Sequence, residues 1–161
     1  MRSLNDNIQE YRVQLRKGHI QKAYAGMISF MSELRQYLMK AHPEYIASSL
    51  YAGYMDMSYF SFTPADFKEK NLKIAIVYLH EKGIFEVWLA GNNKKIQSEY
   101  IELLSHRDIG NYVLSKPDPG VDSIIESILV ETPDFDNYLE LKVEIEMKLI
   151  EYIKDIRSFV S

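Results

Sequence analysis

Two carboxylates in the middle of the chain stand out among the side chains that could do chemistry. Asp56 lies in the aromatic stretch GYMDMSYFSFTP, and Glu86 lies in FEVWLAGNNK. Carboxylates on neighbouring strands can hold a divalent metal ion or accept hydrogen bonds from a bound ligand. With the polar and aromatic residues around them they form one candidate ligand-binding set: Asp56, Ser58, Glu86, Trp88, Asn93 and Lys94.

Strand parity decides which of these side chains can meet. Alternate residues of a strand point to opposite faces of a sheet, so Glu86 and Trp88 share one face, and Asp56 shares a face with Ser58. If the two faces coincide, these side chains line one surface, with residues 92–94 at its rim where a strand passes into a helix. Such a surface suits a small polar ligand or a short peptide.

Each of these residues also has a purely structural explanation, which the residue types favour. Glu86 could form a cross-strand pair with Lys73 or Lys82, and Trp88 could pack under a helix. Asp56 could accept a hydrogen bond from one of the twelve tyrosine hydroxyls, sealed within the core. The question is whether the Asp56 carboxylate opens onto a pocket or lies in that core.

No motif of known catalytic chemistry is present. The chain has no phosphate-binding glycine loop, no GxSxG and no HExxH, and it lacks cysteine. Its four histidines are scattered, as expected of surface or capping residues. We therefore predict no catalytic residue, no metal site and no cofactor, and our first hypothesis is a non-enzymatic binding or protein-interaction domain with a recognition surface on a sheet face.

The alternative function is a metal-assisted hydrolase that uses Asp56 and Glu86. The expected order of helix, three strands, helix and strand resembles the core of the restriction-endonuclease-like nucleases, so the chain could also be a degenerate relative of them. That resemblance implies a lysine two residues after the glutamate, but Trp88 occupies this position. An active nuclease is therefore disfavoured.

The elements that would position these residues follow from the spacing of apolar side chains. Helical spacing predicts helices over 4–17 and 20–42, and a long C-terminal helix capped by Asp134 or Asp136. Alternation with a period of two predicts strands over 52–62, 72–80 and 84–90. The last two strands form a hairpin because Gly83 lies in the short connection between them.

The segments after Gly91 are expected to be mainly helical. Asn92 or Asn93 would cap one helix, NYVLS would add a short strand, and VDSIIESILVE, at 121–131, fits another helix. The result is one α+β domain over residues 1–161, in which a small antiparallel sheet of three to four strands is flanked by long N- and C-terminal helices.

Composition and charge limit the partners. The net charge of −4 argues against nucleic acid as a partner, and no apolar run is long enough to span a membrane, so a cytoplasmic protein is expected. Residues 1–42 carry a net charge of +4 and residues 131–161 carry −4. The terminal helices therefore either lie side by side, within one chain or across a homodimer, or present two separately solvated charged faces.

The chain also resembles a known family in several long stretches. EYRVQLRKGHIQKAYAGMISFM, LYAGYMDMSYFSFTP, LKIAIVYLHEKGIFEVWLAGNNKKIQ and GVDSIIESILVETPDF are similar to an uncharacterised bacterial family known only as a domain of unknown function. The similarity covers nearly the whole chain, and GYMDMSYFSF and FEVWLAGNNK are its most specific parts. It implies a small bacterial cytoplasmic protein of one domain, and it supplies no catalytic residues.

Overall fold

A five-stranded antiparallel sheet forms the centre of the molecule in the computed structural model, which describes residues 1–161. Its strands follow the chain order: β1 (Ile46–Ala47), β2 (Met57–Thr63), β3 (Leu72–Leu79), β4 (Ile84–Gly91) and β5 (Ser123–Val130). Every neighbouring pair is antiparallel. The α+β class and the β3–β4 hairpin are confirmed, but the sheet has five strands where three to four were predicted.

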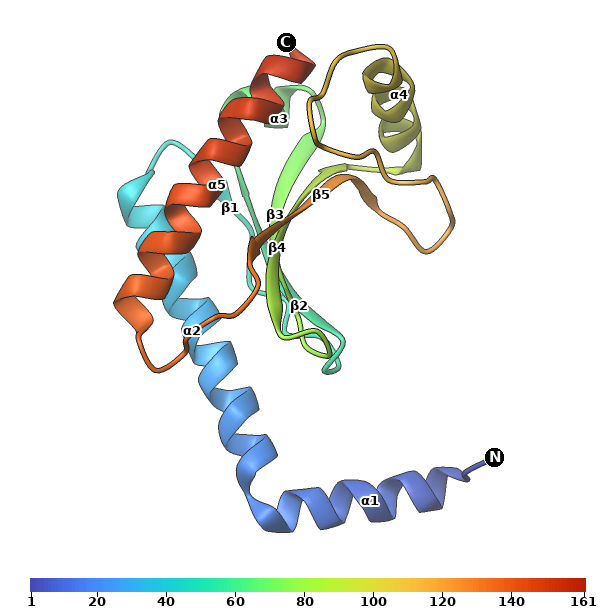
Figure 1. Ribbon diagram of the computed structural model, residues 1–161, viewed down its shortest axis with the longest axis vertical. Helices are drawn as coiled ribbons and strands as arrows, with labels where there is room; N and C mark the ends of the chain where they lie inside the picture. The colour runs from blue at the N-terminus through green and yellow to red at the C-terminus, as the bar shows by residue number, and fades with distance from the viewer.

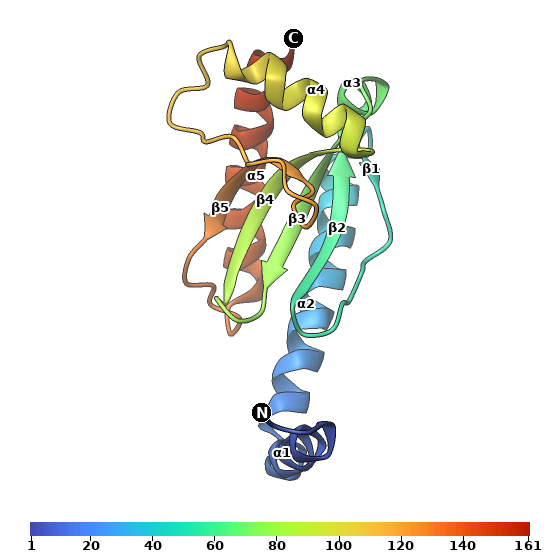
Figure 2. The ribbon, with the colours of Figure 1, turned by 90° about the vertical axis from the view of Figure 1, so that its right-hand side faces the viewer.

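The helices cover the two faces of the sheet unequally. They are α1 (Leu4–Lys17), α2 (His19–Ala41), α3 (Ala65–Glu69), α4 (Lys94–Ser105) and α5 (Tyr138–Val160). The long helices α2 and α5 pack on one face, whereas the other face is crossed only near one end, by α4 (Figures 1 and 2). None of the five helices combines the length and hydrophobicity needed to cross a membrane.

The core lies between the sheet and the two long helices. Phe85, Val87 and Leu89 of β4 are fully buried on this face, as strand parity predicted. Each helix turns one apolar stripe toward them, including Phe30 of α2 and Ile145 of α5. Because α2 and α5 cover only one face, the alternate residues of the strands are left to form a second, open surface.

The segment VDSIIESILVE was wrongly predicted as a helix, because residues 123–130 form β5. Its pairing with β4 skips Ile124 and Leu129, so β5 carries a bulge at each of these positions. A bulge places two consecutive residues against one residue of the partner strand, so the alternation with a period of two is broken there. The resulting pairs of neighbouring apolar residues resemble the spacing of an amphipathic helix. The predicted strand at NYVLS is also wrong, since only an isolated bridge from Leu114 to Ile125 forms there.

Strand β2 starts at Met57 and not at residue 52, because a tight bend precedes it. Gly53 and Met55 have positive φ angles of 74° and 66°. A Cβ atom on Gly53 would lie 2.0 Å from the Met57 carbonyl oxygen, so this close approach requires glycine. The bend interrupts the period-two alternation, which means that Asp56 does not share the face of Ser58.

The two ends of the chain behave differently. Helix α5 begins after Asn137, not at Asp134 or Asp136 as predicted, and lies beside α2. The Tyr37 hydroxyl of α2 donates to the Glu146 carboxylate of α5 at 2.9 Å. Helix α1, in contrast, projects from the body and buries none of its residues (Figure 1).

Candidate functional site

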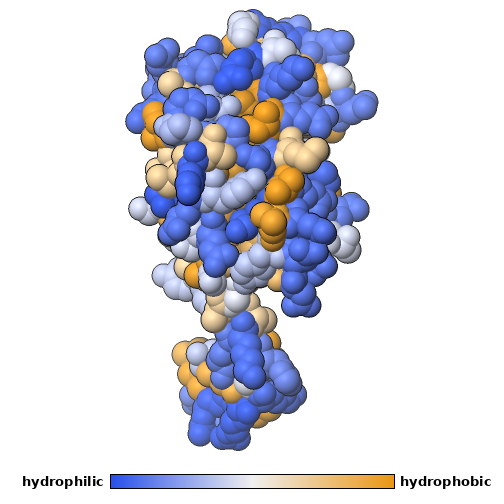
Figure 3. Space-filling model, turned by 90° about the vertical axis from the view of Figure 1, so that its left-hand side faces the viewer, coloured by the Kyte–Doolittle hydropathy of each residue, from blue (hydrophilic) through white to orange (hydrophobic).

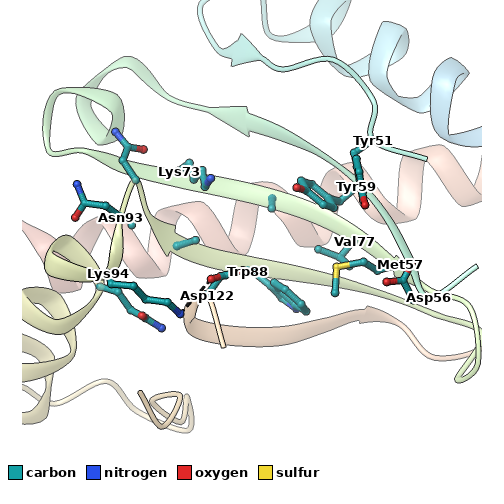
Figure 4. A pocket seen from close by; sticks show the side chains of 15 residues that line it. Tyr51, Asp56, Met57, Tyr59, Lys73, Val77, Trp88, Asn93, Lys94 and Asp122 are labelled. Carbon is teal, nitrogen blue, oxygen red and sulfur yellow. Dashed lines mark ion pairs between the residues drawn. The ribbon is translucent and has the colours of Figure 1, made fainter. Parts of the chain in front are cut away.

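A cavity of about 460 Å³ opens on the uncovered face of the sheet, close to the start of α4 (Figure 4). Its floor is low because small residues, Ala75, Ala90 and Gly91, occupy adjacent positions of β3 and β4. The larger rings of Tyr59 and Trp88 stand beside them. A hollow on a sheet face thus arises from a local change in side-chain size.

One end of the cavity is basic. Lys73, Asn93 and Lys94 gather there, as Figure 4 shows. Lys94 Nζ lies 3.1 Å from the Asp122 carboxylate, so its charge is already paired. Lys73 is exposed and makes no ion pair, which leaves it as the free cation of this end. The Asn93 side chain caps α4 by accepting from the Ile96 backbone N–H at 2.9 Å.

The opposite end of the cavity carries Asp56, which is solvent-exposed. Its carboxylate accepts a hydrogen bond from the Tyr54 backbone N–H at 3.0 Å. Backbone hydrogen bonds, first from Tyr54 and then from Met57, hold the pKa of Asp56 below its ordinary value. Asp56 is therefore a fixed negative charge at neutral pH, and our preference for a place in the core was wrong.

The middle of the cavity is aromatic. The Trp88 indole N–H donates to the Glu86 carboxylate at 2.8 Å, which fixes the orientation of the ring. The rings of Tyr51 and Tyr59 lie with their centroids 5.0 Å apart at the side nearer Asp56 (Figure 4). Glu86 itself is buried, at 7% exposure, and supports Trp88 without lining the cavity.

The predicted set of site residues is thus divided. Asp56, Trp88, Asn93 and Lys94 line one cavity, whereas Glu86 lies beside it and Ser58 is on the core face. Ser58 alternates in phase with Phe60 and Phe62, and two buried phenylalanines could have identified that face as the core. Most of the 15 lining residues were not predicted as site candidates, among them Tyr51, Tyr59 and Lys73.

Ser58 and His80 lie 2.9 Å apart but do not form a nucleophile–base pair. The Ser58 hydroxyl donates its single proton to the Ala52 carbonyl at 2.5 Å, so the His80 ring nitrogen must donate to Ser58 Oγ. Burial also lowers the pKa of His80. Ser58 has no exposed surface, and the contact is therefore structural.

The carboxylates do not supply a metal site. Asp56 and Glu86 do not line the same cavity, and nowhere in the molecule are three or more His, Asp or Glu side chains placed so that they could hold an ion. A metal-assisted hydrolase needs converging oxygen ligands. This donor set therefore does not support the hydrolase alternative.

The fold and cavity define a class: an α+β protein with one helix-covered sheet face and one open face that carries a polar and aromatic hollow. The chain belongs to the family described as a domain of unknown function, DUF7000, whose model matches residues 4–160. Comparison with curated proteins and with solved structures finds no match.

Proposed function

We propose that the protein is a non-enzymatic binding module whose open sheet face takes a short peptide with a charged group at each end. The supporting observation is the cavity itself, with an unpaired Lys73 at one end and the fixed charge of Asp56 at the other. An anionic group of the ligand would lie at Lys73, and a cationic or hydrogen-bond-donating group at Asp56. The apolar part between them would lie against Trp88.

The chemistry of the cavity favours binding over catalysis. Its charged groups sit at opposite ends, separated by an aromatic middle, and no base lies next to a nucleophile there. Separated charges can orient a ligand of matching charge separation, but they cannot act together on one bond. Asp56 lies beside His80, seven residues along the chain from Lys73, so the backbones of Asp56 and Lys73 are about 20 Å apart. Extended peptides of about four to six residues are therefore the first probes, because their terminal carboxylate and ammonium groups are similarly far apart.

Trp88 provides the test, since it is the only tryptophan of the chain. We expect its fluorescence to change on titration with a peptide of this length, and to change less with acetate or an alkylammonium ion alone. Ala75→Leu should abolish the response by filling the floor. Lys73→Ala should weaken affinity by about tenfold, the effect of losing one charge-assisted contact.

The matched control is Lys82→Ala, which removes an exposed lysine from the β3–β4 turn, away from the cavity lining. This variant should bind as the natural protein does. A ligand that binds Ala75→Leu and Lys73→Ala with unchanged affinity would contradict the proposed site. So would a peptide response equal to that of acetate.

A further inference from the structure

Helix α1 is a well-formed helix that has no partner within its own chain. Ser3 and Asp6 form a capping box at its start, and Gly18 ends it in the left-handed conformation with φ of 80°. Yet none of its 14 residues is buried. Helices of this length are marginal in water on their own, because most of their stability comes from packing an apolar face.

The unpacked face of α1 is apolar and is bordered by arginines. Leu4, Ile8 and Tyr11 lie on one side of the helix and are 73%, 45% and 57% exposed. Arg12 and Arg16 follow along one flank of this apolar stripe. In total, residues 2–17 contain four basic and two acidic side chains, so α1 is positively charged.

Helix α5 presents a matching face to solvent. Leu139, Val143 and Met147 are spaced four residues apart and are 65%, 37% and 67% exposed, although the opposite face of α5 is buried in the core. Figure 3 shows an interrupted line of hydrophobic side chains on this side of the body. One flank of the stripe carries three exposed glutamates, Glu140, Glu144 and Glu151, of which Glu144 also pairs with Lys148 of the same helix at 3.3 Å.

The order of the flanking charges selects one orientation. On both helices a charged residue follows a stripe residue by one position: Arg12 follows Tyr11, and Glu144 follows Val143. When each helix is viewed from its N-terminus, the charged flanks therefore lie on the same side of the two stripes. Equivalent flanks meet only when two helices pair antiparallel, as in coiled coils. That orientation would place Arg16 near Glu140 and Arg12 near Glu144.

The matching face of α5 is out of reach of α1 within one chain. Helix α1 leaves α2 at a sharp bend and runs away from the side where its own α5 lies (Figure 1). We infer that two copies exchange their N-terminal helices, with α1 of each packed antiparallel on the outer face of α5 of the other. The exchange is reciprocal, so a two-fold axis gives two such contacts and closes the assembly as a dimer.

Light scattering coupled to size-exclusion chromatography tests this inference, which does not depend on the proposed ligand. We expect a mass of twice 18.8 kDa for the natural chain. Ile8→Glu combined with Tyr11→Glu should give the monomer mass, and so should Met147→Glu on the other side of the contact. The matched control is Lys17→Glu, which also introduces a glutamate but lies nine residues after Ile8, on the opposite face of α1, and should remain dimeric. Far-UV circular dichroism checks that each variant is folded.

Charge reversal tests the orientation. Arg12→Glu with Arg16→Glu should weaken dimerisation by about tenfold or more, and adding Glu140→Arg with Glu144→Arg should restore it. Three results would overturn the inference: a natural chain that is monomeric at about 100 µM, a dimer that persists in Met147→Glu, or reversal on both helices that fails to restore the dimer. The second result would point to pairing between the two α1 helices instead.

Discussion

Among single residues, Tyr152 makes the contact that joins α5 to the sheet. Its hydroxyl donates to the Ile125 carbonyl at 2.8 Å and accepts from the Leu89 backbone N–H at 3.0 Å. These backbone groups lie beside a bulge in β5, where the ladder of the sheet is irregular. We expect Tyr152→Phe to lower the free energy of unfolding by about 1–3 kcal/mol, because it leaves a buried N–H and a buried carbonyl without this partner.

The same variant should change how stability depends on pH. Burial raises the pKa of Tyr152 well above its ordinary value. The unfolded chain therefore loses this proton near pH 10 while the folded chain keeps it, so the stability that Tyr152 adds is complete below pH 10 and is lost as the pH rises further. In urea denaturation between about pH 8 and 11, the free energies of unfolding of the natural protein and Tyr152→Phe should converge as the pH rises.

The control is Tyr54→Phe, at an 89% exposed position, which should match the natural protein at every pH. A difference in free energy of unfolding between the natural protein and Tyr152→Phe that stays constant at all pH values would contradict this explanation.

At the scale of elements, Gly91 allows the end of β4 and the start of α4 to pack closely enough to form the rim of the cavity. A Cβ atom there would lie 2.8 Å from the Gln97 backbone nitrogen and 2.9 Å from the Ile96 side chain. Gly91→Ala should force α4 away and cost about 1–3 kcal/mol in urea denaturation.

The matched control for Gly91→Ala is Gly26→Ala. Gly26 lies within α2, and a methyl group added to it would have no other atom within 4 Å, so alanine there should stabilise the protein by about 0.5–1 kcal/mol. Equal effects of the two substitutions would show that close packing at Gly91 is unimportant.

The elements that were predicted correctly are those whose pattern is set locally. Helix α2 buries one stripe at helical spacing, and β3 and β4 place a large apolar side chain in the core at every second position, so their apolar spacing matches their structure. Strand β5 was mistaken because its two bulges are stabilised only by pairing with β4, a contact between distant segments. Local patterns cannot show how two strands are aligned.

The candidate site was predicted in part for the same reason. Parity within β4 correctly paired Glu86 with Trp88, since it depends on neighbouring residues alone. Parity across the bend at Gly53 failed for Asp56, because the positive φ angles of Gly53 and Met55 are fixed by the close approach of the chain to itself. Lys73 was missed as a site residue because only the register of β3 against β4 places it at the cavity.

At the scale of the whole molecule, α1 should contribute to stability only through association. It buries no residue in its own chain, so deletion of residues 1–17 should leave the fold of the body intact. Binding between folded copies stabilises them by mass action, and the melting temperature of the full chain should therefore rise with protein concentration. The melting temperature of the shortened chain should not. Differential scanning calorimetry over about a hundredfold range of protein concentration distinguishes the two proteins, because each tenfold change in concentration shifts the association equilibrium by about 1.4 kcal/mol. The same concentration dependence in both proteins would show that α1 is not the element that joins the copies.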